Sequence, residues 1–220
     1  MTRTILPMLT LISGPAWADP AAPAVGRVAV EAPLPTAAPA DVSAREVCPV
    51  SIEVHADGSA TQQLAPACPE ALRALVLDAL AGWTYEHVTL PPGADHLLLR
   101  RTLVYNPSGE TPGWSLGLGE PASEPGEPAV IHWSEAKLKR RINPVYPEAA
   151  KGSEPPQVTC TALLTVDTRG AVTQVETWGC PAPFDPAVLD SVPQWAFYPH
   201  KVNGQATAVR FELRLTFVRG

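Results

Sequence analysis

The chain has 220 residues, of which 45% are apolar and 17% are charged. This length and composition suit one medium-sized domain, or two small domains that each have a hydrophobic core. The formal net charge of −6 argues against nucleic acid and anionic lipid as partners, because both are bound through a basic surface. Four basic residues do cluster at 137–141, and we interpret this cluster as a solvated turn.

The N-terminus has the features of a secretory signal peptide over residues 1–18. Arg3 precedes an apolar run at 5–12, and the Ala-Trp-Ala triplet at 16–18 places small residues around a cleavage point. The run is shorter than the roughly 20 apolar residues that cross a bilayer. An uncleaved anchor is the alternative. No later segment is apolar enough to span a membrane, so we expect a periplasmic or secreted protein.

An internal repeat organises the rest of the chain. Cys48 and Cys68 recur as Cys160 and Cys180, at a constant offset of 112 (160 − 48 and 180 − 68). A repeat of this length indicates two copies of one folding unit. Further residues match at the same offset without a gap, namely Gly58 with Gly170, Pro69 with Pro181, Val76-Leu77-Asp78 with Val188-Leu189-Asp190, and Trp83 with Trp195.

The repeat sets the expected domain boundaries. We expect a flexible N-terminal segment at 19–31, a diverged first copy at 32–107 and a second copy at 132–220. Between the copies, residues 108–131 are rich in Gly, Pro, Ser and Glu, which is the composition of a linker.

The predicted elements follow the same order in both copies. The clearest helix lies in the first copy, where apolar residues at helical spacing lead from Leu72 to Trp83. In the second copy, the alternation at 160–167 predicts a strand, and the return strand at 171–178 contains a bulge. The last strand has the cleanest alternation, with one face made of Val209, Phe211, Leu213, Leu215 and Phe217.

These patterns predict an α+β fold made of two tandem β-β-α-β modules, each an antiparallel sheet covered by one helix. Modules this small are marginally stable without a covalent staple. Cys160 and Cys180 are equidistant from Gly170, so a hairpin that turns there brings them together, and Cys48 and Cys68 are related in the same way. We therefore favour the disulfides Cys48–Cys68 and Cys160–Cys180, with pairing between the copies as the alternative.

The sequence offers little for catalysis. No nucleophile, phosphate-loop or zinc-protease motif occurs, and five histidines lie at no ligand spacing. We therefore predict no enzymatic activity, no cofactor and no metal site, with an unrecognised hydrolase as a distant alternative. Trp83 and Trp195 end the two predicted helices, and we interpret them as core anchors.

The second copy resembles the C-terminal domain of the energy transducer TonB. The resemblance covers residues 144–219, and the first copy is a diverged version of the same pattern. It rests on a Tyr-Pro-x-x-Ala opening, a Trp-x-Phe-x-Pro sequence after the helix and an aromatic closing strand, in which the motif residues are Tyr146, Pro147, Trp195, Phe197 and Pro199.

The resemblance implies a protein-binding module rather than an enzyme. In that family the last strand presents a sheet edge to an extended segment of an outer-membrane transporter, so the implied partner is such a transporter or another envelope protein. We see neither the membrane anchor nor the long proline-rich arm of the family, so we do not expect energy transduction.

Strand addition places the partner-binding residues on the outward face of the last strand. These are Arg210, Glu212, Arg214 and Thr216, and the two arginines would favour an acidic segment. Two alternatives remain at this point. In the first, these charges serve only to keep an edge strand from aggregating. In the second, the edges of the two copies pair with each other, and the protein is a structural component of an envelope assembly.

Overall fold

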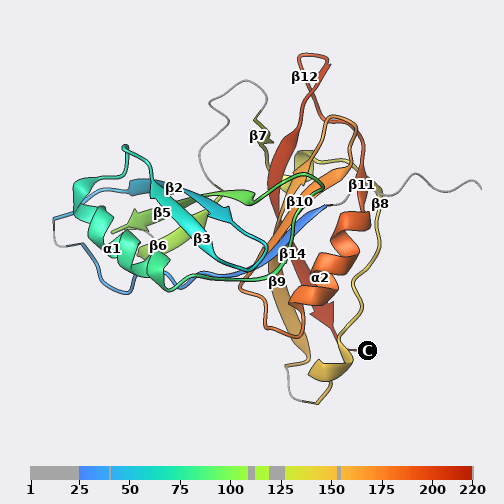
Figure 1. Cartoon of the computed structure of the whole chain (residues 1–220), viewed down its shortest axis with the longest axis horizontal. Coiled ribbons are helices and arrows are strands. Elements are labelled where there is room, and N and C mark those ends of the chain that lie inside the picture. The colour runs from blue at the N-terminus through green and yellow to red at the C-terminus, as the bar shows by residue number, and fades with distance from the viewer. Residues whose placement is uncertain (1–24, 40, 109–111, 119–126, 153–154, 220) are drawn as a thin grey trace, which may run out of the picture.

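The computed structural model describes residues 25–39, 41–108, 112–118, 127–152 and 155–219 (Figure 1). The predicted signal peptide and residues 19–24 lie outside these residues. We refer to residues 25–118 as the first half and to residues 127–219 as the second half. Strands predominate, with two α-helices among the described residues, so the α+β class is confirmed.

The first half contains β1 (Gly26–Glu31), β2 (Glu46–Val54), β3 (Ala60–Leu64), α1 (Glu70–Ala81), β4 (Thr84–Thr89), β5 (Leu97–Asn106) and β6 (Gly113–Gly117). The second half contains β7 (Ala129–Val130), η1 (Trp133–Glu135), β8 (Leu138–Arg140), η2 (Glu148–Ala150), β9 (Gln157–Val166), β10 (Val172–Trp178), α2 (Asp185–Ser191), η3 (Val192–Gln194), β11 (Ala196–Phe197), β12 (Lys201–Val202), β13 (Gln205–Ala206) and β14 (Val209–Val218). The two α-helices lie on opposite sides of the molecule (Figure 1).

Two sheets form the body of the protein. The smaller has the strand order β3-β2-β5-β6, and the larger has the order β4-β1-β10-β9-β14-β7. Each sheet packs its apolar face against one helix. The core below α1 includes Leu72, Val76 and Leu80, and the core below α2 includes Val188 and Leu189. Two short ladders, β11-β8 and β12-β13, complete the second half.

Each half carries its own disulfide, as the hairpin argument predicts. Cys48 is bonded to Cys68 and Cys160 to Cys180, each across 20 residues of sequence. The alternative of pairing between the halves was wrong.

Gly58 lies in the turn between β2 and β3, and Gly170 lies in the turn between β9 and β10. Both have positive φ, at 81° and 88°, a backbone conformation that residues with a side chain rarely adopt. A Cβ on Gly170 would lie 2.0 Å from Phe197 O, and a Cβ on Gly58 would lie 2.7 Å from Tyr85 O. Both positions therefore require glycine for conformation and for space.

Three parts of the expected domain layout were wrong. Residues 26–31, assigned to a flexible segment, form β1, which pairs in parallel with β10 of the second half. β4 pairs with β1, so this strand of the first half also belongs to the larger sheet, which is mixed rather than antiparallel. The predicted linker contains β6 and β7. Long-range pairing stabilises these strands, and composition does not report it.

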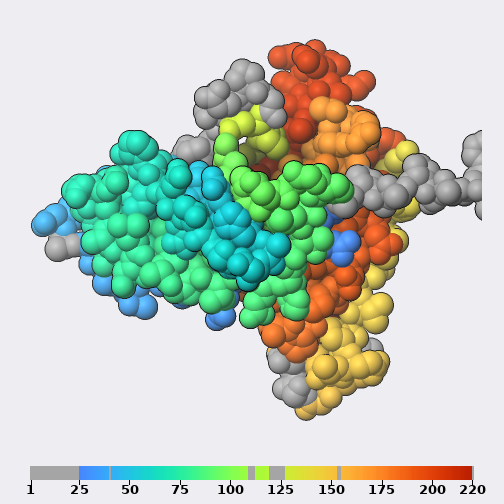
Figure 2. All heavy atoms as spheres, viewed as in Figure 1, coloured from blue at the N-terminus to red at the C-terminus, as the bar shows by residue number. Residues whose placement is uncertain are grey.

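A buried ion cluster joins the halves where the two sheets meet. The carboxylate of Glu176 on β10 accepts a hydrogen bond from Arg101 Nη2 on β5, and Arg210 Nη2 on β14 donates to it at 3.3 Å. Gln174 Nε2 donates to the same carboxylate at 2.9 Å. The Arg101 guanidinium also lies 4.9 Å from the ring centroid of Trp178. The two halves are in direct contact over a broad area (Figure 2).

Replacing Glu176 with alanine should lower the free energy of unfolding by about 3–5 kcal/mol, because it leaves two buried arginines without their counter-charge. Chemical denaturation would measure this loss. Glu148→Ala is the control, since Glu148 is exposed and should change stability by less than about 0.5 kcal/mol. Equal stability of the two variants would show that the cluster contributes nothing.

Removing either disulfide should cost about 3 kcal/mol, because each closes a loop of about 20 residues in the unfolded chain. Urea unfolding of Cys48→Ala/Cys68→Ala and of Cys160→Ala/Cys180→Ala would compare the two losses. A loss below about 1 kcal/mol in both would contradict a stapling role.

Candidate functional site at the open edge of β14

β14 is paired along one edge and largely unpaired along the other. β9 pairs with it along its whole length, from Val209 to Val218. On the other side β7 pairs only with Val209 and Arg210. Among the described residues, no strand pairs with this second edge from Phe211 onward.

The direction of the backbone groups follows from two hydrogen bonds between β14 and the segment around β7. Ala129 N donates to Ala208 O at 2.9 Å and Ile131 N donates to Arg210 O at 3.0 Å, so these two carbonyl groups face the β7 side. Backbone groups alternate between the two edges of a strand. The N–H and C=O groups of Glu212, Arg214 and Thr216 therefore point outward at the open edge.

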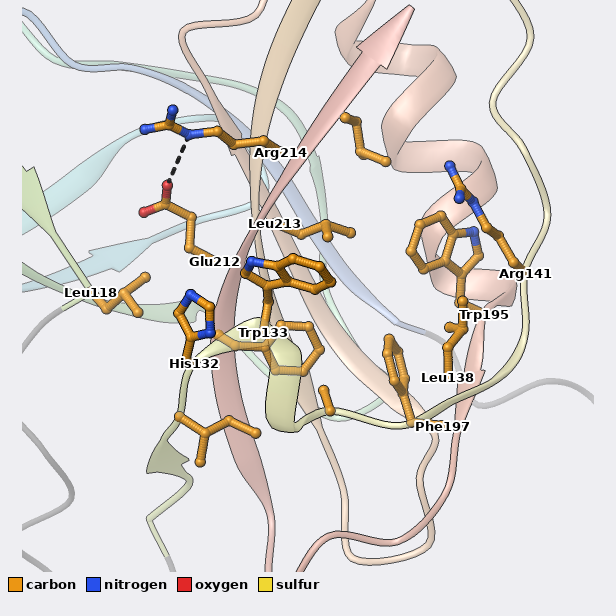
Figure 3. A pocket seen from close by; sticks show the side chains of 14 residues that line it. Leu118, His132, Trp133, Leu138, Arg141, Trp195, Phe197, Glu212, Leu213 and Arg214 are labelled. Carbon is orange, nitrogen blue, oxygen red and sulfur yellow. Dashed lines mark ion pairs between the residues drawn. The ribbon is translucent and has the colours of Figure 1, made fainter.

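The open edge faces a groove of about 770 Å³. Its outer wall is formed by Trp133 of η1 and Leu138 of β8, and its floor includes Leu213, Trp195 and Phe197 (Figure 3). Trp133 is 54% exposed and Leu138 is 40% exposed. The groove thus presents apolar side chains to solvent beside unpaired backbone groups, which are the two features that strand addition requires.

A capping box positions the outer wall of the groove. His132 Nδ1 accepts a hydrogen bond from Ser134 N at 3.4 Å, and Glu135 Oε1 accepts one from His132 N at 3.0 Å. This reciprocal arrangement satisfies the first backbone donors of η1. It fixes the turn that carries Trp133 over the edge of β14.

Positive charge borders the groove. The Arg141 guanidinium lies 5.3 Å from the ring centroid of Trp195, and the Arg214 side chain is 78% exposed. Arg214 Nε lies 3.8 Å from Glu212 Oε1, a separation at which an exposed pair contributes little stability. Arg214 therefore remains accessible to a negative group on a partner.

Arg210 is the predicted binding residue that the structure places elsewhere. It is only 8% exposed, and its Nη2 donates to Arg100 O at 2.8 Å as well as to Glu176. Burial lowers the pKa of Arg210 to about 10, and Glu176 opposes that shift. The prediction that Arg210 contacts a partner was wrong, because the first half packs over the strand face on which Arg210 lies.

The other three predicted residues lie at the site. Glu212 and Arg214 line the groove, and Thr216 follows along the open edge with an exposed side chain. Thr216 Oγ1 lies 3.3 Å from Thr159 Oγ1 of the neighbouring strand.

The motif residues are mostly structural. The indole N–H of Trp195 donates to Ile142 O at 2.7 Å, and that of Trp83 donates to Pro33 O at 3.1 Å. Phe197 packs on Phe211 with ring centroids 5.3 Å apart. The rings of Tyr146 and Phe184 pack edge to face with their centroids 5.2 Å apart. Pro147 precedes η2, and Pro199 is exposed.

Sequence reasoning missed Trp133, Leu138 and Arg141. All three lie just before the family motif, and Leu138 and Arg141 fall in the stretch at 137–141 that we interpreted as a solvated turn. The signal for them was the mixture of exposed apolar and basic residues within 133–141, which a plain solvated turn does not need.

Among the described residues, no three His, Cys, Asp or Glu side chains gather as a metal site would require. No helix in the described part of the chain has the length and apolar character to cross a membrane.

Comparison with known families finds a match over part of this site. Residues 142–218 match the family model described as Gram-negative bacterial TonB protein C-terminal. This segment includes the floor of the groove and all of β14. It supports the resemblance to the TonB C-terminal domain in the second half. A comparison with curated proteins finds no significant match.

Replacing Arg210 with methionine should lower the free energy of unfolding by about 2–3 kcal/mol, because it removes a buried hydrogen bond to a charged group. Arg214→Met should change stability by less than about 0.5 kcal/mol, since its side chain is exposed. Urea denaturation of both variants measures the difference. A larger loss for Arg214→Met would contradict the assignment of Arg210 to the interior.

Proposed function

We propose that this protein is a non-enzymatic binding module of the bacterial envelope that captures an extended segment of another protein at the open edge of β14. The observation that carries the proposal is the coincidence of outward-facing backbone groups with an exposed apolar groove beside them. The match to the TonB C-terminal family supports an envelope protein-interaction module.

The mode of binding is strand addition. Backbone groups of Glu212, Arg214 and Thr216 supply hydrogen bonds that do not depend on the partner's sequence. Specificity comes from side chains of the partner that enter the groove between Trp133 and Leu213. An acidic residue is favoured beside Arg214, because opposite charges across strands stabilise a pair by about 0.2–1 kcal/mol.

The partner we propose is an envelope protein, with the TonB-dependent transporters of the outer membrane as the first class to test. The location we propose is the periplasm, reached through the signal peptide at 1–18. Two disulfides support an oxidising compartment.

We further propose that the two halves are diverged copies of one module. The offset of 112 relates β5 at 97–106 to β14 at 209–218, residue for residue. The strand order β3-β2-β5 in one sheet corresponds to β10-β9-β14 in the other. Gly58 approaches Tyr85 O as Gly170 approaches Phe197 O, and these partners also differ by 112.

A Thr216→Pro variant tests strand addition directly. The N–H of Thr216 points to the open edge, so proline removes a donor that a partner would use while the bonds to β9 remain. Thr216→Ala is the matched control, because it loses the same contact with Thr159 but keeps the N–H. The parent and Thr216→Ala should retain the same envelope proteins from a membrane extract, and Thr216→Pro should lose them.

The position of binding is checked by a photo-cross-linking residue in place of Trp133. It should form adducts with the retained proteins in the parent background and not in the Thr216→Pro background. Folding of each variant is verified by circular dichroism and thermal unfolding. Retention of the same proteins by all three chains, with no adduct at position 133, would reject strand addition at this edge.

A further inference from the structure

The first half already contains an extended segment on the edge that is open in the second half. β6 pairs antiparallel with β5, from Thr102 opposite Gly117 to Asn106 opposite Gly113. Trp114 of β6 packs on Tyr105 with ring centroids 5.2 Å apart, and its indole N–H donates to Ala37 O at 2.9 Å. Leu116 packs against the core of the first half.

The pairing of β6 with β5 can serve as a template for a segment bound to β14, because β5 and β14 correspond at the offset of 112. The stretch of β5 that β6 covers, Thr102–Asn106, corresponds to Arg214–Val218 of β14. β7 reaches only Val209 and Arg210, so the corresponding stretch of β14 has no paired strand on that side among the described residues. β6 is therefore an internal example of what fits this edge.

We infer that the edge of β14 takes an antiparallel segment in the register of β6, in which apolar residues alternate with polar ones and an acidic residue lies opposite Arg214. This inference rests on the proposed function and adds to it a direction, a register and a sequence pattern. In that register, the residues opposite Leu213, Leu215 and Phe217 lie on the apolar face. The residues opposite Arg214 and Thr216 lie on the polar face.

The charge requirement distinguishes the partner from β6 itself. In the first half the position opposite Gly117 is Thr102, which is neutral and buried. In the second half it is Arg214, whose guanidinium is exposed at the border of the groove together with Arg141. A carboxylate opposite Arg214 supplies the opposite charge, which is the favourable cross-strand pair.

The apolar requirement follows from the next position along the segment. A residue opposite Leu213 enters the groove between Trp133 and Leu138, where Leu118 of the first half already forms part of the lining. The segment thus runs, from its N-terminus, apolar, polar, apolar, acidic, apolar. Because β6 covers the equivalent edge of the first half, we expect one such site within the described part of the chain.

A synthetic peptide provides the probe. It has the sequence of residues 112–118 with glutamate in place of Gly117, and blocked ends. Titration into the full protein, followed by amide resonances in NMR, should show one site per chain with shifts along β14. Arg214→Glu should weaken binding about tenfold, and a peptide with lysine at the same position should recover most of the loss on that variant.

A nitroxide at the N-terminus of the peptide reports the direction. Antiparallel binding should broaden the resonances near Val218, whereas parallel binding should broaden those near Phe211. Broadening near Phe211, two sites per chain, or no effect of exchanging the charges would overturn the inference and leave strand addition standing. No peptide binding, together with envelope partners that are lost from Thr216→Pro, would also reject the inference alone.

A second copy of the chain is the competing occupant of the edge. Sedimentation velocity distinguishes it, because a dimer that dissociates in Thr216→Pro and not in Thr216→Ala would mean that β14 pairs with itself. That result would overturn the inferred partner. If neither peptide, envelope protein nor second copy requires the Thr216 N–H, the proposed function fails as well.

Discussion

The carboxylate of Glu176 is the constraint on which the arrangement of the two halves depends. It lies between Arg101 of one sheet and Arg210 of the other, where none of the three charges reaches solvent freely. Such a cluster adds little net stability compared with an apolar contact, but it strongly penalises any arrangement that separates its members. It therefore fixes how the first half sits against β10 and β14. That placement buries one end of the outward face of β14 and leaves the other end open.

The local patterns of the chain were predicted correctly because they depend on neighbouring residues. The alternation of Phe211, Leu213 and Leu215 predicted a strand with one buried face, and the equal spacing of Cys160 and Cys180 around Gly170 predicted the disulfide. The bulge in the return strand appears as a register shift between Val172 and Gln174. Each of these features is determined within about 20 residues of sequence, where hairpin geometry limits the possibilities.

The features that were not predicted depend on contacts between distant segments. β1 has an Ala- and Pro-rich neighbourhood typical of a flexible segment, yet its apolar residues are buried by pairing with β10 and β4. Arg210 follows the same alternation as Arg214, so sequence periodicity places both on the outward face. Only the packing of the other half separates the buried arginine from the exposed one. The groove was missed for the same reason, since Trp133 and Leu138 become a wall only when β14 is beside them.

The parallel pairing of β1 with β10 also affects how the protein folds and which fragments of it keep the native sheet. β1 is the first described strand to be synthesised, and its partner β10 follows 148 residues later (174 − 26), so the larger sheet cannot close until most of the chain is available. Loop closure over such a distance slows folding relative to a hairpin. A fragment limited to the family-matched region would lack β1 and β4, and would expose the edge of β10 together with Glu176. In such a fragment the edge of β10 that pairs with β1 in the intact protein would be free to pair with other chains. Binding measured on the fragment would therefore differ from binding by the whole chain.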